Sequence, residues 1–246
     1  MKFSLIVPLW NEGKNVCDLI SMLADSGLPE DGMGELILIN NGSDDNTGKY
    51  IDEGAEKYSW IIPVHLNENE NYGGGVYEGF KYATNDILGY IPGDLQVSSD
   101  DVVKVWNTFR DSLNNTENLF VKGNRTVRYD PFQTKFVSII YTVLANIILG
   151  LGVKDVNGLP KLFHRSLIDL VPIVRMKTFV FDSQIISLAR VNGWSIKEVP
   201  VTFHSRRQGV SSWSRKRMHV YITVFKQLIQ LRSLRHANGV KMERLR

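Results

Sequence analysis

The sequence holds a single cysteine among its 246 residues. One thiol cannot form an intramolecular disulfide, and a zinc site built from several cysteines is excluded as well. The fold must therefore rest on its hydrophobic core, for which 43% hydrophobic residues are enough. Cys17 lies in a segment with a helical pattern, and a lone thiol fits a reducing compartment. We expect a cytoplasmic location, at the cytoplasmic face of a membrane if the protein docks to one.

A strong excess of charge of one sign is also lacking. There are 29 Lys and Arg residues against 26 Asp and Glu, a formal net charge of +3 that is too small to indicate nucleic-acid binding. The charge is unevenly distributed, because the segment from Arg206 to Arg246 contains eleven basic residues and one acid, Glu243. A basic end of this kind suits an anionic partner, such as a phosphate group or an acidic membrane surface.

Signals of export and of membrane insertion are weak. The chain opens as a strand at 3–8 with no charged leader or cleavage site before it, so we expect no export. The longest apolar stretch, 136–153, contains three polar residues and is shorter than the ~20 residues that a spanning helix needs. This stretch favours an interfacial or buried helix over a membrane span.

Short apolar runs alternate with helical stretches in the first half of the chain, which is typical of βαβ units in a mostly parallel sheet. We predict strands at 3–8, 35–40, 61–65, 87–91, 119–123, near 159–163 and at 195–203. We predict helices at 14–26, 46–58, 74–84, 100–113, 135–151, 181–192 and 216–236. The second half is less regular, so we expect mixed additions to the sheet there. The expected fold class is α/β, with one domain over 1–215 and a basic amphipathic helix over 216–246.

Loops that follow the predicted parallel strands are the candidate site, because ligands bind beyond the carboxyl ends of such strands. Residues 6–12 read Ile-Val-Pro-Leu-Trp-Asn-Glu, and residues 38–45 read Leu-Ile-Asn-Asn-Gly-Ser-Asp-Asp. Residues 71–79 read Asn-Tyr-Gly-Gly-Gly-Val-Tyr-Glu-Gly, where glycines allow a close backbone approach. Residues 89–96 end in Asp-Leu-Gln, so that a carboxylate and an amide oxygen can face one hard divalent cation.

These four motifs, in this order, resemble the family-2 glycosyltransferases of the glycosyltransferase A fold, and within them the polyprenyl-phosphate sugar synthases. The resemblance spans nearly the whole chain and implies a Rossmann-like, three-layer fold with a mostly parallel central sheet. It also implies transfer from a nucleoside-diphosphate sugar with the help of Mn²⁺ or Mg²⁺, bound by Asp94 and Gln96. The implied nucleotide-sugar contacts are Pro8, Leu9, Trp10, Glu12, Asn40, Gly73, Gly75, Asp94 and Arg206.

The chain departs from the family pattern in two motifs. Asn40 and Asn41 stand where the family usually has two acids, and an Asn carbonyl accepts a hydrogen bond more weakly than a carboxylate. The identity of the nucleotide base is therefore open. Pro92 replaces the first Asp of the metal motif, which leaves one carboxylate there. These losses are what a nucleotide-sugar-binding protein without catalysis would show, whereas the retained Asp94 and Arg206 favour an enzyme.

Later motifs extend the resemblance to the acceptor side. Residues 122–125 read Lys-Gly-Asn-Arg, and residues 198–211 carry the family's Glu-x-Pro-x-x-Phe-x-x-Arg-x-x-Gly-x-Ser signature. Residues 155–163 match a stretch that lines the acceptor side, although Asp155 reads equally well as a turn cap. The implied acceptor-phosphate contacts are Arg125, Lys135, Ser138, Arg206 and Ser211.

The acceptor is the main open question within the enzyme interpretation. A polyprenyl phosphate attacks with an anionic oxygen and requires no general base, and inversion at the anomeric carbon is expected. A hydroxyl of a surface polysaccharide or glycolipid would require a base, for which Asp182 is the catalytic candidate, although it also reads as a helix N-cap. Helix 135–151 and the basic helix 216–236 would suit peripheral membrane contact. Helix 216–236 carries an apolar stripe of Val220, Val224, Leu228 and Leu231. Such a stripe equally suits a core face or a homo-oligomer interface.

Overall fold

The computed structural model describes residues 1–113, 118–170, 174–206 and 222–234. The strands are β1 (Phe3–Leu9), β2 (Met33–Asn41), β3 (Ile61–Leu66), β4 (Ile87–Tyr90), β5 (Leu119–Arg128), β6 (Lys161–His164) and β7 (Ser195–Phe203). The helices are α1 (Gly13–Ala24), α2 (Leu28–Asp31), α3 (Thr47–Lys57), α4 (Asn71–Phe80), α5 (Ser99–Ser112), α6 (Phe132–Leu149), α7 (Ser166–Asp169) and α8 (Val180–Val191). A further helix covers residues 222–234.

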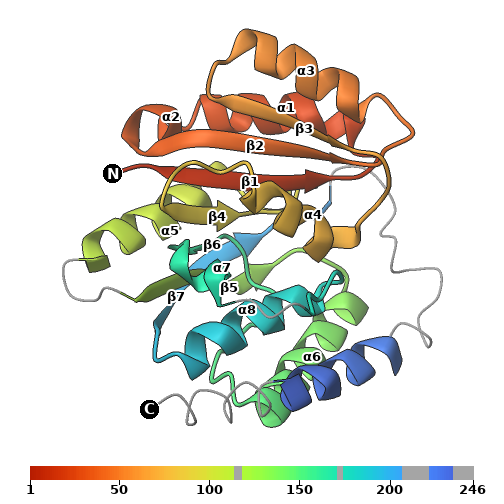
Figure 1. Ribbon diagram of the computed structural model, residues 1–246, viewed down its shortest axis with the longest axis vertical. Helices are drawn as coiled ribbons and strands as arrows, with labels where there is room; N and C mark the ends of the chain where they lie inside the picture. Colours follow the sequence, from red (N-terminus) through yellow and green to blue (C-terminus); the bar gives the residue numbers. More distant parts are fainter. Residues whose placement is uncertain (114–117, 171–173, 207–221, 235–246) are drawn as a thin grey trace.

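The described strands form one seven-stranded sheet in the order β3-β2-β1-β4-β6-β5-β7 (Figure 1). β1 pairs in parallel with β2 and β4, β2 with β3, and β5 with β7. β6 runs antiparallel to both of its neighbours, β4 and β5. The predicted α/β class with a mostly parallel sheet and mixed additions in the second half is confirmed.

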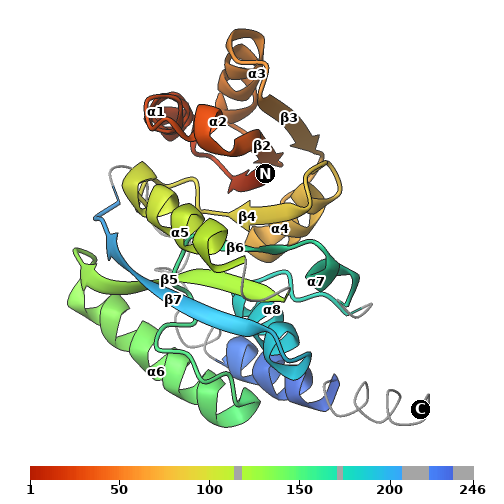
Figure 2. The same ribbon diagram turned by 90° about the vertical axis from the view of Figure 1, so that its left-hand side faces the viewer.

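Helices cover both faces of the sheet, which is why its central strands are apolar on both sides. α1 and α5 lie on one face and α4 and α8 on the other (Figure 2). α1 buries Val16, Leu19, Ile20 and Leu23, the spacing of three or four residues that one face of a helix requires. In β1 every residue is buried except Pro8, as expected for a strand covered on both faces.

Several element boundaries differ from the sequence-based expectation. The short helices α2 and α7 were not predicted, because four residues are too few for a helical hydrophobic period. α4 begins at Asn71, three residues before its predicted start. The N-cap of α8 is Phe179, so Asp182 lies inside the first turn and the N-cap interpretation of that residue is wrong.

α6 lies at the molecular surface. Among the described helices it is the one long and apolar enough to cross a membrane by length and composition alone, and 22% of its most apolar window is buried. The buried alternative is therefore wrong, because most of this apolar surface faces outward, and the interfacial alternative stays a prediction. Its exposed apolar side chains are Phe132, Phe136, Val137, Ile139, Ile140, Val143, Leu144 and Ile147.

The helix of residues 222–234 lies with α6 at the end of the molecule away from β3, as Figures 1 and 2 show. Val224, Leu228 and Leu231 of the predicted apolar stripe are buried against the protein. The described part of the stripe is therefore a core face, and contact of this helix with a membrane or with a second copy stays a prediction. Val220 and most of the basic end lie outside the described residues, so the predicted division at 215 stays a prediction.

Candidate active site

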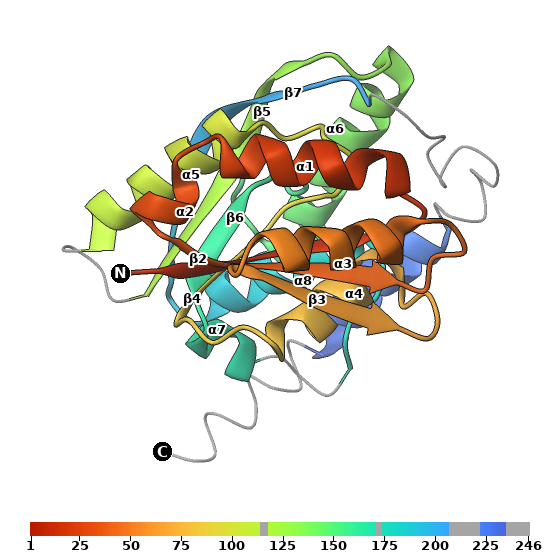
Figure 3. The same cartoon turned by 90° about the horizontal axis from the view of Figure 1, so that it is seen from above.

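Parallel pairing brings the ends of β1, β2 and β3 to one edge of the sheet, on the right in Figure 3. Asp94 lies four residues beyond β4 and is nearly buried. Its Oδ2 accepts a hydrogen bond from Arg206 at 2.7 Å, and its Oδ1 accepts one from the backbone N–H of Gln96 at 3.3 Å. The Gln96 amide donates to the His204 carbonyl at 2.9 Å. The two predicted metal ligands therefore lie next to the segment that carries Arg206.

The protein ligands around Asp94 are only part of what a hard divalent cation requires. Asp94 and Gln96 can supply one carboxylate and one amide oxygen, the ligand chemistry that Mg²⁺ and Mn²⁺ prefer. No group of three or more His, Cys, Asp or Glu residues suited to a metal occurs among the described residues. Further oxygens would have to come from the diphosphate of a donor, which is how such cations are held in many phosphate-binding enzymes.

The first predicted loop is fixed by polar contacts between α1 and α3. The backbone N–H of Glu12 donates to Thr47 Oγ1 at 3.0 Å, and Asp45 accepts from the N–H groups of Gly13 and Thr47 at 3.1 and 2.9 Å. Burial raises the pKa of Glu12, whose carboxylate accepts a hydrogen bond from Asn15 at 2.5 Å. These bonds hold the loop of residues 10–12, which contains two of the predicted nucleotide-sugar contacts, in one conformation.

The other predicted residues of this loop differ in what they can offer a nucleotide. Trp10 is 43% exposed, so its ring face is open for stacking. Leu9 is fully buried, and its side chain belongs to the core. Only the backbone of Leu9 could contact a ligand. Pro8 is half-buried and packs beside the glycine-rich helix.

The second predicted loop shows why asparagine replaces one of the family's acids. Asn41 is buried, and its amide donates to the Asn71 carbonyl at 3.1 Å while its oxygen accepts from the Glu70 N–H at 3.0 Å. An aspartate could accept but not donate here. Asn40 is half-buried and lies within 3.2 Å of His65 Nδ1, and its oxygen accepts from the Ser43 N–H at 3.1 Å.

Gly73 packs α4 tightly against the segment before α8, and Gly75 packs it against the ends of β1 and β2. A Cβ on Gly73 would lie 2.5 Å from the Met176 carbonyl oxygen, and one on Gly75 would lie 3.0 Å from Pro8 Cβ. The N–H of Gly73 donates to the Lys177 carbonyl at 2.7 Å. These contacts give a packing reason for both glycines, and their contact with a nucleotide sugar stays a prediction.

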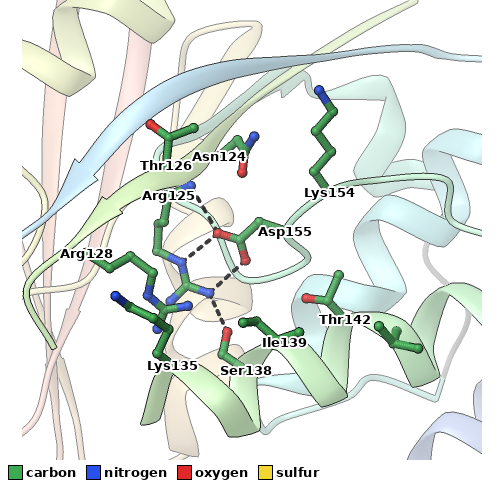
Figure 4. A pocket seen from close by; sticks show the side chains of 11 residues that line it. Asn124, Arg125, Thr126, Arg128, Lys135, Ser138, Ile139, Thr142, Lys154 and Asp155 are labelled. Atoms are coloured by element: carbon green, nitrogen blue, oxygen red, sulfur yellow. Dashed lines mark hydrogen bonds and ion pairs between the residues drawn. The ribbon is translucent and has the colours of Figure 1, made fainter. Parts of the chain in front are cut away.

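A pocket with a volume of about 260 Å³ lies between β5 and α6 (Figure 4). The structure brings together three of the predicted acceptor-phosphate residues here, Arg125 from β5 and Lys135 and Ser138 from α6. The full lining is Asn124, Arg125, Thr126, Arg128, Lys135, Ser138, Ile139, Thr142, Val143, Lys154 and Asp155.

Arg125 is held rigidly at this pocket. Its guanidinium donates to both carboxylate oxygens of Asp155 and to Ser138 Oγ, each at 2.7 Å. Burial alone would raise the pKa of Asp155, but the bonds from Arg125 outweigh burial and hold that pKa well below its usual range. Asp155 is thus a partner of the predicted phosphate-binding arginine, a role that the turn-cap interpretation does not contain.

Sequence reasoning missed Arg128 and Lys154 as pocket residues. Residues three apart on a regular strand point to opposite faces, so Arg128 has no obvious reason to join Arg125. The register of β5 against β7 shifts between Arg125 and Val127, and this bulge brings Arg128 to the pocket side. Arg128 donates to Asp130 at 2.9 and 2.5 Å.

Asp182, the candidate base, is buried on α8 and engaged by three donors. Its Oδ1 accepts from Lys161 Nζ at 2.5 Å and from the Tyr90 hydroxyl at 2.8 Å, and its Oδ2 accepts from the Asn157 amide at 3.0 Å. Burial lowers the pKa of Lys161 to about 8, and the carboxylate beside it limits the fall. The function of Asp182 as a general base stays a prediction.

The remaining predicted residues lie elsewhere. Arg206 contacts Asp94 and is not among the residues that line the pocket. Ser211 lies outside the described residues, as do residues 207–210 of the same motif.

Residues 4–171 match the family model described as glycosyl transferase family 2, which covers more than half of the chain. The chain belongs to glycosyl transferase family 2. It is 25% identical over 224 residues to a dolichol-phosphate mannosyltransferase of Pyrococcus furiosus, an alignment that covers 90% of this chain and 62% of that protein. It is 24% identical over 169 residues to an undecaprenyl-phosphate 4-deoxy-4-formamido-L-arabinose transferase of Proteus mirabilis, covering 68% and 50%. The chain thus spans half to two thirds of the length of such relatives.

Among solved structures, this family-2 chain resembles glucosyl-3-phosphoglycerate synthase from Mycobacterium tuberculosis, crystallised with Mn²⁺, UDP and glucosyl-3-phosphoglycerate. The TM-score is 0.68 at 16% sequence identity, and the match covers 95% of this chain and 79% of that one. At this identity the likeness concerns the fold, and it confirms the predicted glycosyltransferase A type.

Proposed function

We propose that this protein is an inverting glycosyltransferase that moves a sugar from a nucleoside-diphosphate sugar to a polyprenyl phosphate. The observation that carries the proposal is the basic pocket of Arg125, Lys135 and Ser138 between β5 and α6. The names of its relatives, which specify dolichyl or undecaprenyl phosphate, support a lipid phosphate as the acceptor.

The charges around the pocket favour a dianionic phosphate. Arg125 and Arg128 are each paired with a carboxylate, Asp155 and Asp130. Within the described part of the chain, no carboxylate contacts the ammonium groups of the other two lining cations, Lys135 and Lys154. A phosphate monoester carries nearly two negative charges at neutral pH and would balance these two. Asp155 and Ser138 engage the Nε and Nη2 hydrogens of Arg125, which leaves the two N–H groups of Nη1 to donate to a phosphate oxygen.

The surroundings of Asp182 favour a phosphate over a hydroxyl as the attacking group. A hydroxyl must lose a proton to a base that it can reach, whereas a phosphate oxygen is already anionic. Asp182 is 2% exposed and accepts hydrogen bonds from Lys161, Tyr90 and Asn157. A carboxylate so engaged is a poor general base, which weakens transfer to a glycan hydroxyl as the second candidate.

On the donor side, Asp94 and Gln96 would hold Mn²⁺ or Mg²⁺ together with the donor diphosphate. When bound, such a cation offsets the negative charge that develops on the leaving diphosphate. Arg206 donates to Asp94 at 2.7 Å, which supports a role for it in binding the same phosphates. The exposed ring of Trp10 would stack on the nucleotide base.

The apolar face of α6 supports docking at a membrane surface. Ile139 and Val143 line the pocket and are also exposed, so the pocket opens onto this face. Contact with an anionic bilayer would bury the apolar side chains and bring Lys135 and Lys154 close to lipid phosphates. The acceptor could then enter the pocket headgroup first while its chain stays in the membrane.

Product analysis tests the proposal. Purified protein is incubated with Mn²⁺, a panel of nucleotide sugars and a short prenyl phosphate, and the lipid extract is analysed by mass spectrometry. We expect a prenyl-phosphate sugar, lost in Arg125→Ala. A sugar joined only to added glycans would favour the second candidate.

Flotation with phosphatidylglycerol liposomes tests the membrane contact. Phe136→Ser with Ile147→Ser should weaken flotation, because both side chains are exposed on α6. Tyr82→Ser is the matched control, since Tyr82 is 47% exposed just beyond α4. Intact protein that stays soluble at low salt would contradict docking.

A further inference from the structure

Two lysines lie side by side in the sheet and are fully buried. Lys122 on β5 and Lys161 on β6 are direct partners in the antiparallel pair of these strands, so their side chains leave the sheet on the same face. Both residues are 0% exposed. Like charges opposite each other destabilise a sheet, and a buried ammonium is costly unless it is well paired. Such a pair calls for a reason beyond the stability of the sheet.

Lys122 holds the backbone at Asp155. Its Nζ donates to the Asp155 carbonyl, to the Gly123 carbonyl at 2.6 Å and to Glu198 Oε1 at 3.3 Å. Glu198 in turn accepts from the backbone N–H groups of Lys154 and Asp155, at 2.9 and 3.3 Å. Lys122 therefore binds the backbone carbonyl of Asp155, and Glu198 binds the backbone N–H groups of Lys154 and Asp155.

Lys161 holds the same segment two residues later, through Asp182. Its Nζ donates to Asp182 Oδ1 at 2.5 Å, and Asp182 Oδ2 accepts from the Asn157 side chain at 3.0 Å. The Tyr90 hydroxyl also donates to Asp182, at 2.8 Å, and links this centre to the end of β4. Segment 155–157 is thus tied at one end to Lys122 and at the other to Lys161.

This segment carries the carboxylate that orients Arg125. Asp155 accepts two bonds from the Arg125 guanidinium and one from its backbone N–H, at 3.1 Å. Neither buried lysine lines the pocket, so any effect of theirs on a bound anion must pass through this segment. A shift of Asp155 would turn the guanidinium of Arg125 and move its free N–H groups away from the pocket.

We propose that Lys122 and Lys161 are positioning residues for the acceptor, which fix segment 155–157 so that Asp155 presents Arg125 to the acceptor phosphate. The inference rests on the proposed function, because it takes the pocket to bind phosphate. A lysine suits the task because its ammonium donates up to three bonds and offsets nearby carboxylates. Buried ion pairs of this kind add little stability but specify one geometry.

The most direct test is Asn157→Ala, which cuts the link between Asp182 and the segment without leaving a buried lysine unpaired. Lys161→Met combined with Asp182→Leu is the second variant, since it removes both buried charges together. Asn192→Ala is the matched control, because its amide donates at 2.8 Å to the Leu188 carbonyl at the far end of α8. Binding of inorganic phosphate and of citronellyl phosphate is measured by calorimetry, and Mn²⁺ binding by electron paramagnetic resonance.

We expect phosphate binding about 10-fold weaker in Asn157→Ala and in the double variant, the usual effect of losing an orienting partner. Asn157→Gln should recover part of the loss, and Asn192→Ala should behave like the wild type. Mn²⁺ binding should change less than twofold in every variant. Phosphate affinities within twofold of the wild type in both Asn157→Ala and the double variant would overturn the inference and leave the lysines a purely structural role.

The two probes separate this inference from the proposed function. Wild-type protein that binds inorganic phosphate but not citronellyl phosphate would exclude the lipid acceptor, and the variants would still decide the inference with inorganic phosphate. If the wild-type protein binds neither inorganic phosphate nor citronellyl phosphate, both the proposed function and the positioning role of the lysines would be overturned.

Discussion

Replacing Arg206 with alanine should change metal binding and diphosphate binding in opposite directions. Its guanidinium donates to Asp94 Oδ2 at 2.7 Å, on the carboxylate proposed to hold the cation, so Arg206 and a cation compete for that group. The Arg206 and Asp94 side chains are 29% and 10% exposed, so solvent screens part of the attraction. About 1 kcal/mol is then a reasonable value for the pair. Arg206→Ala should accordingly bind Mn²⁺ alone about 5-fold more tightly.

The opposite effect concerns the donor phosphates. Arg206 is proposed to donate to the diphosphate, and losing a hydrogen bond to a charged group costs ~1.5–3 kcal/mol. Inorganic diphosphate, in the presence of saturating Mn²⁺, should therefore bind about 10- to 150-fold more weakly to Arg206→Ala. One substitution would strengthen one ligand and weaken the other, which general destabilisation of the fold cannot do.

Electron paramagnetic resonance of free Mn²⁺ measures the first effect, and calorimetry with inorganic diphosphate measures the second. Arg110→Ala is a suitable control, because Arg110 pairs with Asp31 at 2.9 Å and is 41% exposed on α5. Mn²⁺ affinity that is unchanged or lower in Arg206→Ala would refute the competition. Loss of Mn²⁺ binding in Asp94→Asn would show that the measured ion is the one at this site.

Three further predictions concern single residues. Asp94→Asn should lower turnover by ~100-fold with an unchanged melting temperature, because it removes the charged metal ligand; near-normal activity would exclude Asp94 from the site. Arg125 depresses the pKa of Asp155 below its ordinary 3.8, so the stability that this carboxylate contributes is complete above that pH and lost below it. Urea unfolding of wild type and Asp155→Asn should thus differ more at pH 7 than at pH 3, and an equal difference would contradict this. Asn40→Asp should tighten donor binding or change the preferred nucleotide base; unchanged affinities for all nucleotides tested would mean that Asn40 does not face the base.

Features encoded in short segments could be predicted from the sequence. The alternation of apolar runs with helical periods predicted all seven strands, because both periods are local properties of the chain. Six of them agree within two residues at each end, whereas β5 continues to Arg128, five residues beyond its predicted end at 123, because its last residues are polar. The proximity of Asp94 and Gln96 is likewise a local property, because both residues follow the end of β4 within six residues. The meeting of Arg125, Lys135 and Ser138 followed from family resemblance, and the structure brings these residues together in one pocket.

Pairing between distant segments was decided only by the tertiary structure. The insertion of β6 between β4 and β5 makes Lys161 the direct neighbour of Lys122, 39 positions earlier, and no local pattern contains that register. The same packing buries Asp182 against Lys161 and so removes the open surroundings that a general base needs. A bulge in β5 turns Arg128 toward the pocket against the ordinary alternation of a strand. Burial and charge partners depend on which segments meet in space, and hydrophobic periodicity alone does not specify that.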